Sequence, residues 1–239
     1  MQKILSLFSN TPENVGDMAC SWGNIYRRYY PTILAHINDI RDDYDQFDLT
    51  VIGGGCIINK SHEEGIWRAI EKSKKCIIRS VGVKDWKFAQ KLKEKLGNDF
   101  TIRHQVDGFI YEPCPSLWEV ERYKMTHRIN ENLSKNKDLL FAMHQNNKNE
   151  IELLKKQKKD IIINKCTFEH AIEKISQYKK VVTSSYHFMI WANAFKCDIE
   201  LFEIKHDMDF EKLDEDSDLR KFFFIPINYS CVDLKKYLT

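Results

Sequence analysis

Short apolar runs alternate along the chain with longer stretches in which apolar residues recur at helical spacing. In the first half, the runs at 3–8, 49–52 and 76–81 are strand candidates, and the stretches at 63–74 and 85–96 are helix candidates. Gly97 follows the second helix candidate, at the position where a left-handed cap is usual. This alternation predicts an α/β protein with parallel sheets.

The alternation begins again in the second half of the chain, after a polar stretch rich in asparagine and lysine at 126–137. We therefore predict a boundary near residue 125, with one Rossmann-like domain over 1–125 and a second over 126–239. The segments expected after the boundary are strands at 139–143, 161–164, 181–183 and 199–204 and helices at 149–156, 167–178, 186–195 and 232–238.

Charge and composition exclude several classes of protein. The 239 residues include 37 basic and 35 acidic side chains, and a formal net charge of +2 is too small for a dedicated nucleic-acid binder. The seven cysteines contain no Cys-x-x-Cys pair and no histidine has metal-ligand spacing, so we expect reduced thiols and no metal site. Without a signal peptide or an apolar run of about 20 residues, we expect a cytoplasmic protein with no integral membrane segment.

Turns between a strand and a helix are the candidate ligand sites, because ligands of open α/β sheets bind at the carboxyl ends of the strands. The first such turn follows the strand at 3–8 and contains Asn14, Gly16 and Asp17. Glycine permits a tight turn there, and the polar side chains can cap or orient the following helix. A plain helix cap is the alternative function of these residues.

The second turn is a run of three glycines, Gly53, Gly54 and Gly55, directly after the strand at 49–52. A backbone without side chains can approach a ligand closely, so we expect a larger residue at Gly54 to abolish ligand binding. The run belongs to no Gly-x-Gly-x-x-Gly or phosphate-loop pattern, so neither a nicotinamide site nor a P-loop is predicted.

The third turn contains Ser184, Ser185, Tyr186 and His187, where an apolar strand gives way to an apolar helix. Hydroxyl and N–H groups at such a turn suit a phosphate or carboxylate, and His187 can exchange a proton near neutral pH. A packing role is the alternative for this histidine.

Three more residues at predicted strand ends are candidates of second rank. His104 and Arg103 follow the strand expected at 100–103, and His144 follows the strand at 139–143. Arg103 could hold an anion, and the two histidines are alternatives to His187 for proton transfer.

Taken in order, the three turns resemble the motifs of the polysaccharide pyruvyl transferase family. The resemblance also takes in Val81-Gly82-Val83, Thr101-Ile102-Arg103 and the turn at 112–117, and it extends from Asn14 to about Cys197. It implies two Rossmann-like domains with parallel sheets facing across a cleft, similar to GT-B enzymes. It also implies transfer of a pyruvyl group from phosphoenolpyruvate, as co-substrate and without a cofactor, to a sugar of a cell-surface polysaccharide or its nucleotide- or lipid-linked precursor.

The chain departs from the family pattern at two positions. Ser185 stands where many members have the arginine expected to hold the donor phosphate, and Phe188 stands where they have glycine, whereas Tyr186 matches a branch of the family. A GT-B glycosyltransferase that uses a nucleotide sugar, and a non-catalytic carbohydrate- or nucleotide-binding relative, are therefore alternatives. The resemblance makes His187 the first candidate for proton transfer, and it leaves a homo-oligomer open.

Overall fold

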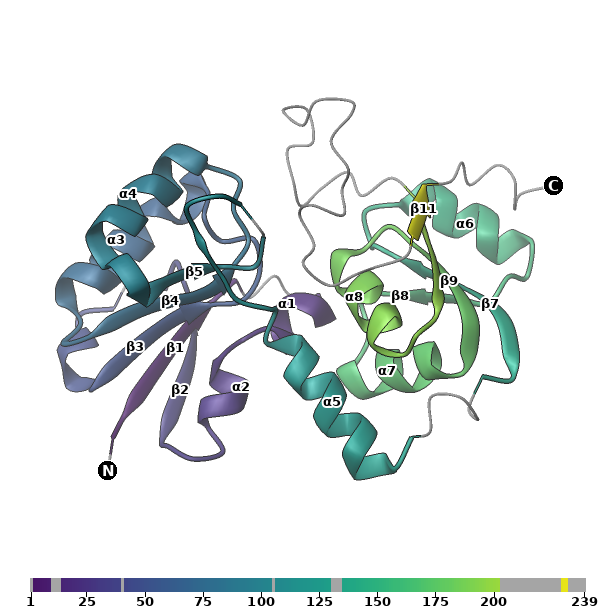
Figure 1. Cartoon of the computed structure of the whole chain (residues 1–239), viewed down its shortest axis with the longest axis horizontal. Helices are drawn as coiled ribbons and strands as arrows, with labels where there is room; N and C mark the ends of the chain where they lie inside the picture. The colour runs from purple at the N-terminus through teal and green to yellow at the C-terminus, as the bar shows by residue number, and fades with distance from the viewer. Residues whose placement is uncertain are drawn as a thin grey trace. The chain divides into compact units, whose positions relative to one another are not determined.

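A computed structural model describes residues 2–9, 14–39, 41–104, 106–129, 135–202 and 229–231. The chain divides into two compact units: among the described residues, 2–9 and 17–115 form the N-terminal unit, and 14–16, 116–202 and 229–231 form the C-terminal unit. Each unit contains one parallel sheet with helices, which confirms the expected Rossmann-like α/β class (Figure 1).

The N-terminal unit contains a six-stranded sheet in the order β2-β1-β3-β4-β5-β6. All neighbouring strands are parallel. The strands are β1 (Ile4–Phe8), β2 (Thr32–His36), β3 (Leu49–Gly53), β4 (Cys76–Val81), β5 (Phe100–Ile102) and β6 (Ile110–Tyr111), and the helices are α1 (Val15–Ala19, which begins in the C-terminal unit), α2 (Gly23–Tyr26), α3 (Glu63–Lys72) and α4 (Trp86–Leu96).

Helix α4 shows how the sequence determines these elements. The Asp85 carboxylate accepts a hydrogen bond from Phe88 N–H at 2.9 Å and so caps the start of the helix. Phe88, Ala89 and Leu92 are buried against the sheet, and Gly97 ends the helix with φ of +56°. Cap, apolar face and final glycine all lie where the sequence predicts them.

The C-terminal unit contains a five-stranded sheet in the order β11-β10-β9-β7-β8, again with parallel neighbours. The strands are β7 (Lys137–Met143), β8 (Ile161–Ile163), β9 (Tyr178–Thr183), β10 (Asp198–Leu201) and β11 (Tyr229–Cys231), and the helices are α5 (Ser116–His127), α6 (Lys148–Lys156), α7 (Phe168–Ser176) and α8 (Tyr186–Ala194). The closing helix expected at 232–238 lies outside the described residues.

The two units meet in the sequence between Pro115 and Ser116, earlier than the predicted boundary near residue 125, which falls inside α5. Helix α5 belongs with α8, because Trp191 Nε1 donates to Ser116 Oγ at 2.9 Å and Lys124 Nζ donates to the carbonyl of Ala194 at 2.8 Å. The polar stretch that suggested the boundary therefore follows a helix of the second unit.

The described helices include none that combines the length and apolarity needed to cross a bilayer. The longest of them, α5, has 12 residues and contains charged side chains on several turns.

Candidate functional site

The predicted site residues fall into two sets, one in each unit. Because the strands of each sheet are parallel, their carboxyl ends lie together at one end of that sheet. The N-terminal unit holds Asp17, Gly53, Gly54, Gly55, Arg103 and His104, and the C-terminal unit holds Asn14, Gly16, His144, Ser184, Ser185, Tyr186 and His187.

Ser184 ties together the carboxyl ends of β7 and β9. Its hydroxyl accepts a hydrogen bond from His144 N–H at 2.9 Å and donates one to Asn147 Oδ1 at 2.7 Å. The imidazole of His144 is itself oriented, since Nδ1 accepts from Asn146 N–H at 3.3 Å. Ser184, His144 and Asn147 are all buried. Asn147 therefore belongs to the site, although sequence reasoning missed it.

Asn164, directly after β8, is a second residue that sequence reasoning missed. Its Oδ1 accepts a hydrogen bond from Gln145 N–H at 2.8 Å, and its main-chain carbonyl accepts one from Val15 N–H at 2.8 Å. The side chain is buried, and among the described residues Nδ2 has no acceptor. Turning the amide over would place Nδ2 against the N–H of Gln145, so the orientation is fixed. The C-terminal unit thus holds a buried donor that lacks an acceptor.

Segment 14–16 covers this end of the sheet and brings Gly16 against His187. A Cβ atom on Gly16 would overlap Nδ1 of the His187 ring, so only glycine permits this close approach. The N–H of Gly16 donates to Asn14 Oδ1 at 3.0 Å. This N–H already has a partner and α1 has only five residues, so the helix start at Gly16 stays an untested candidate for holding an anion. Asn14 and Gly16 form a turn that packs on the histidine.

His187 lies in the first turn of α8, and its ring is buried. The ring centroid is 5.2 Å from that of Tyr186 and 5.9 Å from that of Trp191. Ser185 is the N-cap residue, yet within the described chain its side chain makes no capping bond to the helix. The start of α8 therefore combines an imidazole and a hydroxyl with the N–H groups of a helix N-terminus, which favour anions.

In the N-terminal unit, backbone conformation and close packing require glycine in the run at 53–55. Gly54 and Gly55 have φ of +96° and +76°, and a Cβ on Gly54 would lie 2.6 Å from the carbonyl oxygen of Cys20. The N–H of Gly55 donates to Cys20 Sγ at 2.9 Å. These contacts give a structural reason for glycine at 54, because a larger residue would strain the backbone and collide with Cys20. The expected loss of ligand binding stays a prediction.

Two thiols also meet in this unit. Burial, together with a hydrogen bond to Cys114, raises the pKa of the Cys20 thiol well above its usual range. Both cysteines are free, as are the other four whose side chains are described. The protonated state of Cys20 is therefore favoured, and its thiol is a poor nucleophile.

Arg103 and His104 directly follow β5, and both side chains are buried. A Cβ on Gly82 would lie 2.8 Å from Arg103 Nη2, so the guanidinium passes directly over that glycine. His104 is 1% exposed, and neither ring nitrogen has a hydrogen-bond partner among the described residues. Burial and the neighbouring Arg103 lower the pKa of His104 to about 3. The ring is therefore neutral near pH 7, which does not suit the general-acid role held in reserve for His104.

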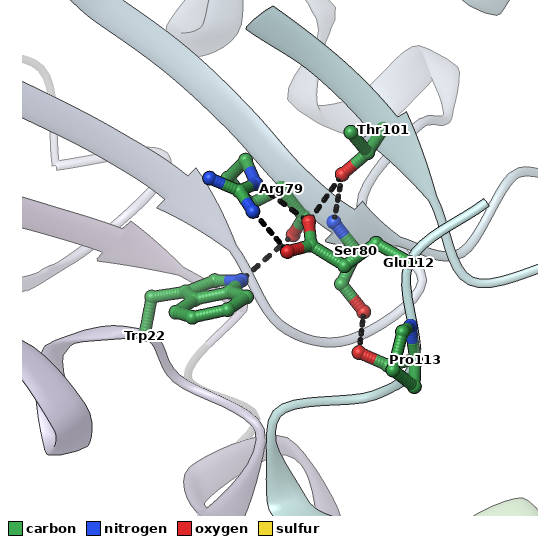
Figure 2. Close-up of polar contacts among 6 residues, drawn as sticks. All are labelled: Trp22, Arg79, Ser80, Thr101, Glu112 and Pro113. Carbon is green, nitrogen blue, oxygen red and sulfur yellow. Dashed lines mark hydrogen bonds and ion pairs between the residues drawn. The ribbon is translucent and has the colours of Figure 1, made fainter. Parts of the chain in front are cut away.

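A polar network that the sequence did not predict connects β4, β5 and the segment after β6 (Figure 2). The Glu112 carboxylate accepts hydrogen bonds from Arg79 Nε at 2.6 Å and from Thr101 Oγ1 at 2.5 Å, and it also pairs with Arg79 Nη2. Ser80 donates its N–H to Thr101 Oγ1 at 2.8 Å and its hydroxyl to the carbonyl of Pro113 at 2.8 Å.

Trp22 completes the network. Its Nε1 donates to the carbonyl of Arg79 at 3.1 Å, and the Arg79 guanidinium carbon lies 5.2 Å from the centre of its ring. The Glu112 side chain is only 14% exposed and both its oxygens accept hydrogen bonds, so this network fixes the segment that follows β6.

Replacing Glu112 with glutamine should lower the free energy of unfolding by about 3 kcal/mol, because a half-buried guanidinium loses its charged partner. Urea unfolding followed by circular dichroism measures the effect. The matched control is Asp138→Asn, which breaks the exposed ion pair with Lys179 and should cost no more than about 0.5 kcal/mol. Equal losses in the two variants would show that the network adds nothing beyond a surface pair.

Comparisons with known proteins identify a similar fold but indicate no activity. No protein-family model matches the chain, and no curated protein matches it. A solved structure of an uncharacterized protein from Klebsiella pneumoniae is similar, with a TM-score of 0.53 and 14% identity over 97% of this chain and 92% of that one. At this identity the similarity shows the fold alone, and it covers both units.

Proposed function

We propose that the protein is a transferase that moves the pyruvyl group of phosphoenolpyruvate to a sugar of a cell-surface polysaccharide or its precursor. It would act in the cytoplasm, with its two units in the GT-B-like arrangement that the family resemblance implies. The observation that carries the proposal is the buried Asn164 Nδ2, a fixed donor without an acceptor among the described residues, at the same end of the sheet as His187.

The proposed donor substrate carries anionic oxygens that could accept hydrogen bonds from the N–H groups of this site. Phosphoenolpyruvate carries a carboxylate and a phosphate, and anionic oxygens accept strong hydrogen bonds from amide N–H groups and from helix N-termini. Asn164 is joined to Val15 through its carbonyl, and the next residue, Gly16, contacts the His187 ring. An anion on Asn164 Nδ2 would therefore bind in the part of the unit that also holds the imidazole.

The reaction needs three events at one place. A general acid protonates the methylene carbon of the enol phosphate, a base takes the proton of the sugar hydroxyl that attacks the neighbouring carbon, and phosphate leaves with the electron pair of its C–O bond as a second hydroxyl of the same sugar, losing its own proton, bonds to that carbon and closes the ketal. His187 is the residue that we assign to proton transfer, and His144, whose Nδ1 accepts from Asn146 N–H, is the second histidine at this end of the sheet.

One observation favours a second candidate function. The hydrogen-bonding side chains of Ser184, Asn147 and Asn164 in the C-terminal unit are neutral. Ser185 occupies the position of the family arginine. Neutral donors suit a nucleotide sugar, so a GT-B glycosyltransferase, or a binding protein of that fold without chemistry, is the alternative.

Calorimetric titration separates these functions. We expect phosphoenolpyruvate to bind, and Asn164→Asp to weaken its binding roughly 10- to 100-fold, because this change removes the donor but keeps the acceptor for Gln145 N–H. Asn147→Asp is the matched control: it adds the same charge to the same cluster and keeps the acceptor for Ser184, so we expect an effect of about threefold or less.

Each other outcome has a distinct meaning. Binding of a nucleotide sugar but not of phosphoenolpyruvate would replace the first candidate by the second. Equal weakening by both variants would show a charge effect and remove Asn164 from the ligand contacts. A thermal-shift panel gives an independent readout, since a ligand at about 100 times its dissociation constant adds roughly 2.7 kcal/mol to stability.

A further inference from the structure

Lysines gather at the opposite end of the C-terminal sheet, where its strands begin. The parallel strands begin at the same end of the sheet, where β9 begins beside Lys137, β10 beside Lys180, and β8 beside Phe141, four residues into β7. Lysines lie at or next to the starts of four neighbouring strands: Lys137 in β7, Lys158 and Lys159 before β8, Lys179 and Lys180 in β9, and Lys196 before β10.

Helix α6 ends at the same place and adds two more lysines. Lys155 and Lys156 lie in its last turn, and Lys158 and Lys159 follow within the turn that leads to β8. We call these four residues the lysine cluster. Lys155, Lys156 and Lys158 are exposed, and Lys159 is half-buried.

Acidic residues neutralise other lysines at this end of the sheet but not the cluster. Lys179 pairs with Asp138 at 2.9 Å, and Lys180 pairs with Glu200 at 2.5 Å. Within the described residues, no carboxylate lies within ion-pair distance of the four cluster lysines. Glu152 and Asp160 are the only carboxylates in the sequence from 152 to 160, so the four lysines leave this segment a local excess of two positive charges.

Stability accounts for only part of this arrangement. Cations in the last turn of a helix interact with its dipole for about 0.3–1 kcal/mol each, which explains Lys155 and Lys156. Lys158 and Lys159 lie beyond the helix, and four like charges within five residues repel one another. An anionic partner would remove that repulsion.

We propose that the lysine cluster binds the anionic headgroups of a phospholipid membrane. Ammonium groups on long flexible side chains suit a plane of mobile anionic headgroups, where each lysine contributes about 1 kcal/mol, whereas bidentate phosphate recognition favours arginine. Leu153, on α6 one turn before Lys156, is 44% exposed and adds an apolar side chain beside the charges. The cluster contains no aromatic ring on which nucleic-acid bases could stack.

Sedimentation of the full chain with lipid vesicles tests this. We expect binding to vesicles that contain phosphatidylserine, little binding to pure phosphatidylcholine, and loss of binding as salt is raised. Changing all four cluster lysines to glutamine should weaken binding roughly 1,000-fold, at about 1 kcal/mol for each lysine. The matched control changes Lys60, Lys87, Lys91 and Lys95, exposed lysines of the N-terminal unit, to glutamine and should retain wild-type binding.

Three results would overturn the proposal: equal loss of binding in the control, equal binding of the wild type to neutral vesicles, or tighter binding to a random RNA than to anionic vesicles at the same salt. A double variant, Lys158→Gln with Lys159→Gln, changes no residue of α6 and should weaken vesicle binding roughly 30-fold at an unchanged melting temperature. This result does not depend on the proposed transfer reaction, because it requires no donor or acceptor substrate.

Discussion

His187→Gln should reduce turnover by about 100-fold or more while leaving the fold and phosphoenolpyruvate binding intact, since general acid–base groups contribute at least this much. The ring lies at the carboxyl end of the sheet, held between Gly16 and the aromatic rings of Tyr186 and Trp191. Glutamine keeps a polar side chain of similar length but cannot exchange a proton near neutral pH. Phosphate release in the presence of glycan acceptors measures turnover, and calorimetry measures donor binding.

Gly16→Ala provides an independent test of the same histidine. The added methyl group would overlap the ring at Nδ1, so the imidazole must move although it is still present. We expect a loss of turnover comparable to that of His187→Gln, because positioning errors of about 1 Å can cost 100-fold. If His187→Gln kept near-normal turnover, or failed to fold, the histidine would serve packing and proton transfer would pass to His144.

His104→Leu should change how stability depends on pH. The pKa of His104 falls from 6.5 to about 3 on folding, so between these values the unfolded chain binds a proton that the folded chain does not. Stability of the wild type therefore falls as the pH drops below 6.5, and at pH 5 this one group costs about 2 kcal/mol. The leucine variant lacks this loss and should also gain about 1–2 kcal/mol at neutral pH, because it removes two buried ring nitrogens that have no partner among the described residues.

Urea unfolding at pH 7.5 and pH 5 measures both effects. His170→Leu removes an exposed histidine from α7 and should follow the wild-type curve. Parallel pH dependence in the wild type and the His104 variant would mean that His104 takes up a proton in the folded state as readily as in the unfolded one.

The elements that the sequence predicts well are those whose signals are local. Helix α7 begins where Thr167 Oγ1 accepts from His170 N–H at 3.2 Å, a cap that the sequence shows directly. Strand β2 was missed because it lies at the edge of its sheet and exposes Ile33 and Leu34, so no buried apolar run marks it. The apolar run at 106–111 predicts a strand, and β6 occupies only its last two residues, Ile110 and Tyr111.

The residues of the candidate site likewise divide into those with a local signal in the sequence and those that only the fold brings together. The turn from Ser184 to His187 was identifiable because hydroxyls and an imidazole follow an apolar strand. Asn164 has a comparable signal, an asparagine after three isoleucines, but its importance depends on contacts with Gln145 and Val15 that are distant in sequence. Arg79 and Glu112 are 33 residues apart, and only the fold brings them together.

Residues 14–16 belong to the unit whose other described residues follow 115, and this has a consequence for synthesis on the ribosome. The N-terminal unit can begin to fold while the second half is still being translated, as domains generally do. Segment 14–16, in which Val15 bonds Asn164 and Gly16 contacts His187, has by then left the ribosome. It cannot pack until the second half of the chain has been synthesised. Protection of the Val15 amide from hydrogen exchange on stalled nascent chains should therefore appear only after β8 and α8 have emerged.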